Sequence, residues 1–260
     1  MKVAYELNPP KIAPEGRLYD RQGLDADMQA MVDRASRLGK LAAVGGIHLT
    51  DSVLGVPRVS SLTAAHHVKK VIDGSSVKTR CSLRTSDRNV ITLYQAATDA
   101  ILLGVDSLLV LMGDAPTDGR DSGLKPSAAI ALLKEKGFDR NIKLHMSFPA
   151  RVPADKKDSP AVRSKLAALP HAFVTQSISS LSDLGGIVDL AKPHGIGVVA
   201  CIMVPSEKNL QSARMIGLDW SLYEKEPAEF VRAAGRLAGS VLLTSPNSFA
   251  SGLDLLKQLA

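Results

Sequence analysis

The chain has 260 residues, of which 45% are hydrophobic and 22% are charged, as is ordinary for a globular protein. Its formal net charge is +6, but the basic residues are spread along the chain, whereas nucleic-acid binding gathers them on one face or helix. The positive excess fits an anionic small ligand and an ordinary surface equally well. Because the basic residues are spread out, we expect no nucleic-acid partner. No uninterrupted apolar stretch of about 18 residues occurs, so we also expect no membrane-spanning helix.

The first residues lead straight into an apolar strand without the long apolar segment of a signal peptide, which indicates a cytoplasmic protein. The two cysteines, Cys81 and Cys201, each lie within a predicted strand, where free thiols are commonly buried. A redox pair or a zinc site would need closer spacing or histidine neighbours. We therefore expect two reduced core thiols and no metal.

Short apolar stretches alternate with longer amphipathic ones along the whole chain. The predicted strands are Val3–Leu7, Ala42–Ile47, Val77–Leu83, Ser107–Met112, Lys143–Met146, Ala172–Thr175, Gly197–Met203 and Ser240–Leu243. Helical periodicity is expected over Asp25–Leu38, Ser61–Ile72, Asn89–Leu103, Ser127–Lys136, Asp158–Leu169, Ser180–Ala191, Ser206–Met215, Pro227–Leu237 and Gly252–Leu259.

This alternation predicts an α/β protein, a (β/α)8 TIM barrel that forms a single domain over residues 1–260. The helix at Pro227–Leu237 is expected to be an insertion before the last strand. An open doubly wound sheet is the alternative, although no G-x-G-x-x-G follows the first strand.

Glu6 ends the first predicted strand and is followed closely by Pro9 and Pro10, which cannot donate to a sheet. It therefore lies at the carboxyl end of a strand, where barrels of this class carry their active sites. Asp114 follows the fourth strand, and a pair of carboxylates across one mouth would support proton transfer. The plainer alternatives are a solvated carboxylate for Glu6 and a turn or helix cap for Asp114.

The other strand ends supply further candidates for the same mouth. They are Thr50, Asp51, Ser82, Arg84, Met112, Gly113, Phe148, Gln176, Gln211, Thr244, Ser245 and Asn247. His48 lies near the end of the second strand and is a weaker candidate. No serine-hydrolase elbow and no P-loop occurs.

Five of these segments resemble methylenetetrahydrofolate reductase, in the order of that family. They are residues 4–11 (Ala-Tyr-Glu-Leu-Asn-Pro-Pro-Lys), 83–89 (Leu-Arg-Thr-Ser-Asp-Arg-Asn), 104–116 (ending Met-Gly-Asp-Ala-Pro), 173–176 (Phe-Val-Thr-Gln) and 202–206 (Ile-Met-Val-Pro-Ser) with Gln211. The departures include Met112 before Gly-Asp, Ser82 where the family has a flavin-contacting histidine, and Ala161 and Ser164 in the fifth helix.

The resemblance implies reduction of 5,10-methylenetetrahydrofolate to 5-methyltetrahydrofolate, a step of one-carbon metabolism that serves methionine biosynthesis, with NADH or NADPH reducing a bound FAD. Glu6 would be the general acid and Asp114 its catalytic companion. Substrate contacts would come from Thr50, Asp114, Gln176 and Gln211. Cofactor contacts would come from Thr50, Asp51, Ser82, Arg84, Met112, Gly113, Asp114, Phe148, Asp158 and Lys165.

Two other functions stay open at this point. One is a reductase of a related one-carbon pterin that works without flavin or with a deazaflavin. The other is a folate-binding partner protein without catalysis, which hands on methyl groups. The partners expected are tetrahydrofolate and a second copy of the chain in a homo-oligomer.

Overall fold

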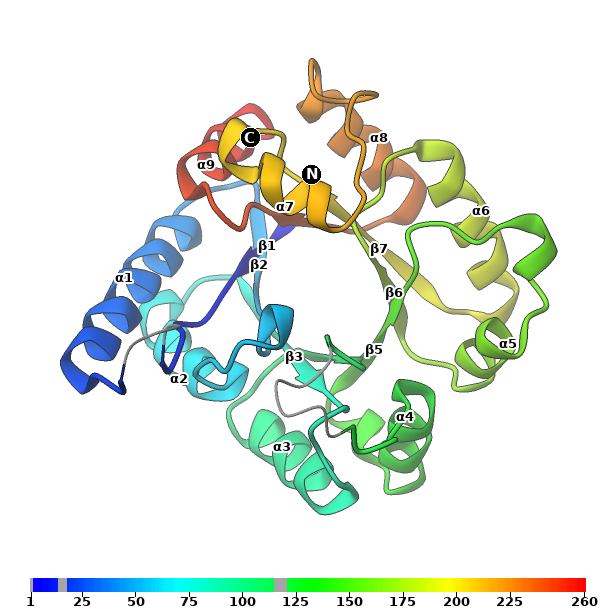
Figure 1. The fold of residues 1–260 in the computed structure, drawn as a ribbon, viewed down its shortest axis with the longest axis horizontal. Coiled ribbons are helices and arrows are strands. Elements are labelled where there is room, and N and C mark those ends of the chain that lie inside the picture. Colours follow the sequence, from blue (N-terminus) through cyan, green and yellow to red (C-terminus); the bar gives the residue numbers. More distant parts are fainter. Residues whose placement is uncertain (1, 14–17, 115–120) are drawn as a thin grey trace. The chain divides into compact units, whose positions relative to one another are not determined.

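The structure is a computed structural model that describes residues 2–13, 18–114 and 121–260. Eight parallel strands follow one another in a closed barrel, and helices alternate with them along the chain (Figure 1). The strands are β1 (Val3–Leu7), β2 (Val44–Leu49), β3 (Lys78–Arg84), β4 (Ser107–Leu111), β5 (Lys143–Phe148), β6 (Ala172–Thr175), β7 (Gly197–Met203) and β8 (Val241–Thr244). The predicted (β/α)8 fold is confirmed.

The α-helices lie close to the ranges that the periodicity predicts. They are α1 (Arg21–Gly39), α2 (Ser61–Ile72), α3 (Val90–Leu102), α4 (Pro126–Glu135), α5 (Pro160–Ala167), α6 (Leu181–Ala191), α7 (Leu210–Met215), α8 (Pro227–Ala238) and α9 (Phe249–Gln258). One expectation is wrong: α8 packs against β7, β8 and α6, so it is the regular helix between these strands. The additional element there is the short α7.

The contacts within the chain divide it into two compact units. One comprises Met1–Glu6, Leu41–Gly46 and His145–Ala260, and the other comprises Leu7–Lys40 and Ile47–Leu144. In the first unit β1 pairs with β8, and β5, β6, β7 and β8 pair in sequence. In the second unit β3 pairs with β4 over five residue pairs.

The pleat of β1 sets the direction of Glu6. The ring of Tyr5 packs edge-on against Phe249 of α9, with 5.9 Å between the ring centroids. Successive side chains of a strand point to opposite faces of the sheet. Because Tyr5 faces the helical layer, Glu6 points to the inner side of the sheet.

Within the described part of the chain, no helix has the length and apolar character needed to cross a membrane. The segment after β4 is only partly described, and the predicted motif residues Ala115 and Pro116 lie outside the described residues.

Candidate acid–base site

The carboxyl of Glu6 is held at the carboxyl end of β1, beside β8. Its Oε1 accepts a hydrogen bond of 2.7 Å from Oγ1 of Thr244. Burial raises the pKa of Glu6, and the hydrogen bond from Thr244 opposes that rise with a smaller effect. Desolvation of this kind favours the neutral form of a carboxyl. Glu6 therefore keeps its proton to a higher pH than a solvated glutamate, as a general acid requires.

The thiol of Cys201, in β7, is close enough to Glu6 to interact with its charge. Burial raises the pKa of Cys201 to about 12, with a further contribution from the charge of Glu6. The hydroxyl of Ser177 lies 3.7 Å from the sulfur, and Oγ1 of Thr175 accepts a 3.0 Å hydrogen bond from the Cys201 backbone N–H. Since only the thiolate is a nucleophile, Cys201 contributes apolar surface at neutral pH.

The first unit also places an amine at a strand end. Lys165 of α5 extends to β5, where its Nζ donates a 2.6 Å hydrogen bond to the carbonyl of Ser147 and lies 5.7 Å from the centre of the Phe148 ring. Burial lowers the pKa of Lys165. A partly desolvated lysine has a larger neutral fraction, and the neutral amine is the form that attacks carbonyl groups.

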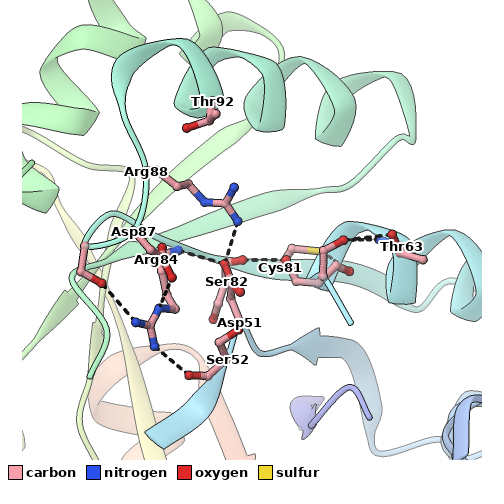
Figure 2. A network of polar contacts seen from close by, with 12 residues as sticks. Asp51, Ser52, Thr63, Cys81, Ser82, Arg84, Asp87, Arg88 and Thr92 are labelled. Carbon is pink, nitrogen blue, oxygen red and sulfur yellow. Dashed lines mark hydrogen bonds and ion pairs between the residues drawn. The ribbon is translucent and has the colours of Figure 1, made fainter. Parts of the chain in front are cut away.

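In the second unit, a buried arginine connects the segments that follow three strands. The Arg84 side chain donates to the carbonyls of Ser52 at 2.7 Å and Asp114 at 2.8 Å, and to the hydroxyl of Ser86 at 3.2 Å. Its Nε forms an ion pair of 3.1 Å with Asp87. Figure 2 shows this guanidinium between Ser52 and Asp87. A buried charge is tolerated when it is paired and hydrogen-bonded in this way.

Asp51 balances a second arginine in the same network. Its Oδ2 accepts hydrogen bonds from the Arg84 backbone N–H at 3.2 Å and from Arg88 at 3.1 Å (Figure 2). Asp51 is buried, so these contacts replace the water that a solvated carboxylate would bind. Arg84 and Asp51 together hold the loops after β2, β3 and β4 in one arrangement.

Asp114 holds a neighbouring loop in the second unit. Its carboxylate is exposed and accepts a 2.7 Å hydrogen bond from the Leu54 backbone N–H. Leu54 has a φ of 61°, which is unusual for a residue with a side chain, and the carboxylate stabilises that turn. Glu6 and Asp114 belong to different units, so their expected pairing stays a prediction.

The other predicted contact residues divide into paired and exposed groups. Thr50 donates a 2.8 Å hydrogen bond to Asn8. Ser82 and His48 share a buried hydrogen bond of 2.8 Å. The exposed ones are Met112, Asp158, Gln176 and Gln211.

Four of the expected FAD contacts, Thr50, Ser82, Arg84 and Phe148, are already engaged with other parts of the protein. Thr50, Ser82 and Arg84 are buried and make hydrogen bonds within the protein. Phe148 is only 1% exposed, and its ring stacks on that of Phe173 with 4.3 Å between the centroids. A flavin at these four residues would have to displace these contacts. The binding of FAD and the use of NADH or NADPH stay predictions.

Sequence reasoning missed two structural roles. Arg84 was expected to contact a cofactor, but it connects three loops, and an arginine directly after the predicted strand Val77–Leu83 was the available signal. Asn209 is fully buried and donates hydrogen bonds to the carbonyl of Val204 and the hydroxyl of Ser245. No pattern in its local sequence indicates that burial.

Comparison with known proteins identifies a fold class. No family model and no curated protein matches the chain. A solved structure assigned as a deoxyribose-phosphate aldolase from Coccidioides immitis aligns with 98% of this chain and 83% of its own length, at 10% identity and a TM-score of 0.56. The aldolase QR15 aligns with 100% of this chain and 96% of its own length, also at 10% identity and a TM-score of 0.56. At this identity the likeness shows the shared barrel.

These comparisons correct the functional prediction. The solved structures above are named as aldolases, which are lyases, whereas the sequence predicted an NAD(P)H-dependent flavoprotein oxidoreductase of folate metabolism. The predicted reduction of methylenetetrahydrofolate and its pterin and folate-binding alternatives are therefore wrong. The resemblance rested on short segments at strand ends, and barrels of unrelated function place polar residues at the same positions.

Proposed function

We propose that the chain is an aldolase-type enzyme, which makes or breaks a carbon–carbon bond next to a carbonyl group, with Glu6 as its proton donor. The observation that carries the proposal is the carboxyl of Glu6, hydrogen-bonded by Thr244 at a strand end and with its pKa raised by burial. Bond cleavage of this kind produces an enol or enamine carbon, and a neutral acid beside it supplies the proton that this carbon requires. The names of the structural neighbours support the same reaction class.

Lys165 is the proposed nucleophilic amine. Its lowered pKa and its position at the carboxyl end of β5 suit attack on a substrate carbonyl, with loss of water, to form a Schiff base. The iminium then withdraws electrons from the bond that breaks, and hydrolysis restores the amine. Two free buried thiols fit a reducing compartment, so we also propose a cytoplasmic location.

Proton exchange tests the role of Glu6. The enzyme is incubated in D2O with acetaldehyde, acetone or pyruvate, and deuterium uptake at the carbon next to the carbonyl is followed by NMR. We expect Glu6→Gln to slow exchange by roughly 10²–10⁴-fold. The control variant is Glu224→Gln, which changes an exposed glutamate of the same unit and should exchange deuterium like the native chain. A native chain that exchanges none of the three compounds, or a Glu6→Gln rate within about threefold of native, contradicts the proposal.

Trapping tests the role of Lys165 separately. Sodium borohydride added with acetaldehyde should leave one ethyl group on the native chain, which peptide mass spectrometry locates. The label should be absent from position 165 in Lys165→Met and unchanged in Lys156→Met, an exposed lysine just before α5. Label that is equally abundant on surface lysines excludes Lys165 as the amine.

A further inference from the structure

A basic cavity lies at the opposite end of β3 from the Arg84 network. It has a volume of about 310 Å³, and its walls come from the end of α2, the turn after it, the start of β3 and the end of α3. Thr79 lines it, whereas Arg84 belongs to the other end of the strand. Arg84 lies five positions after Thr79 in the strand, a distance of about 16 Å. The cavity is therefore distinct from the network described above.

Helical spacing brings three basic side chains to this cavity. His66, Lys69 and Lys70 all line it, and residues three and four apart lie on the same side of a helix. Among the described residues that line the cavity, only Asp73 is acidic, and its carboxylate accepts a 3.0 Å hydrogen bond from the Gly74 backbone N–H. The cavity thus carries a positive excess at neutral pH, which attracts anions.

Lys69 is held in place at the wall of the cavity. Its Nζ donates a 2.8 Å hydrogen bond to the carbonyl of Gly104, and the residue is half-buried. An ammonium group has three N–H donors, so this contact leaves two for a ligand. A charge that is already positioned loses less side-chain entropy when it binds.

The remaining lining is suited to an organic group. Ile72, Val77 and Leu103 supply apolar surface, and Ser75 and Thr79 supply hydroxyls. The volume is at the lower end of the range for small-molecule sites, roughly 300–1,000 Å³. We propose that this cavity binds a small phosphate monoester, with its phosphate at Lys69 and Lys70 and its organic part on the apolar wall.

Titration with phenyl phosphate tests the site. Inorganic phosphate and phenol, which are the two halves of this ligand, are titrated separately for comparison. Calorimetry should give saturable binding with a Kd of about 1 mM or tighter for phenyl phosphate, and weaker binding for each half. The amide signals of Gly74 and Ser75 should shift in NMR spectra. Added salt should weaken binding, because screening reduces the attraction between charges.

Charge removal tests the contacts. Lys69→Met combined with Lys70→Met should weaken binding about tenfold or more, since each removes a charge-assisted contact. Lys192→Met, an exposed lysine elsewhere, should bind like the native chain. If the double variant does not fold, Lys70→Glu replaces it, because Lys70 is exposed, and this variant should also bind phenyl phosphate more weakly than the native chain. No saturation below about 10 mM, or a double variant that binds like the native chain, overturns the proposal.

Discussion

Gly113 allows the buried Arg84 to pass beneath the segment after β4, and replacing it with alanine should destabilise the protein strongly. The glycine has a φ of 84°. A Cβ at this position would lie 2.8 Å from Nε and 2.9 Å from Cγ and Cζ of Arg84. The guanidinium cannot move aside freely, because it donates hydrogen bonds to the carbonyls of Ser52 and Asp114.

The cost of Gly113→Ala has two separable parts. An alanine in left-handed backbone geometry costs about 1–2 kcal/mol. Displacing Arg84 weakens hydrogen bonds made by a charged group, each worth about 1.5–3 kcal/mol. If one or two of these are weakened, the clash adds about 2–4 kcal/mol to the backbone cost.

Gly123→Ala measures the backbone part alone. Gly123 has a φ of 73°, and a Cβ there would have no neighbour within 4 Å. Urea unfolding should show that Gly113→Ala lowers the free energy of unfolding by about 2–4 kcal/mol more than Gly123→Ala does. A difference below about 1 kcal/mol would refute the reasoning, because it would mean that Arg84 moves aside without losing its contacts.

The pH dependence of stability should follow Glu6. Above its ordinary pKa of 4.5 the unfolded chain ionises while the folded chain stays protonated, so stability falls with rising pH until the raised folded pKa is passed. Glu6→Gln should remove that fall in urea unfolding measured from pH 4 to 8, and an unchanged slope would contradict the raised pKa. Burial raises the pKa of both Cys81 and Cys201 to about 12, so iodoacetamide at pH 8 should label neither thiol until urea unfolds the chain. Labelling of the native chain at the rate of the unfolded one would show that burial does not protect them.

The strands were predictable because parallel strands buried on both faces read as short apolar stretches. Val3–Leu7, Ala172–Thr175 and Gly197–Met203 have the predicted bounds. The role of α8 was not predictable, since α7 and α8 both have helical character and only packing on β7 and β8 identifies α8 as the regular helix. Periodicity reports that a segment is helical, and the layer in which it packs depends on distant residues.

The site was only partly predictable. A glutamate followed by two prolines indicated a strand end, and Thr244 was among the candidates at the end of β8, but the hydrogen bond between them joins residues 238 positions apart. Arg84 was recognised as a strand-end residue, yet its partners come from the loops after β2, β3 and β4. Sequence motifs describe neighbours along the chain, and these contacts are between segments that are distant in it.

The sequence by itself determined the barrel and the place of Glu6, because periodicity, strand length and proline stops are local properties of the chain. Only the tertiary structure decided that this carboxyl is desolvated and hydrogen-bonded, that Asp114 supports the turn at Leu54, and that Lys165 reaches β5. The physical reason is that burial and hydrogen bonding depend on which distant groups enclose a side chain. Those groups set the pKa, and the pKa decides whether a carboxyl donates a proton or stays ionised.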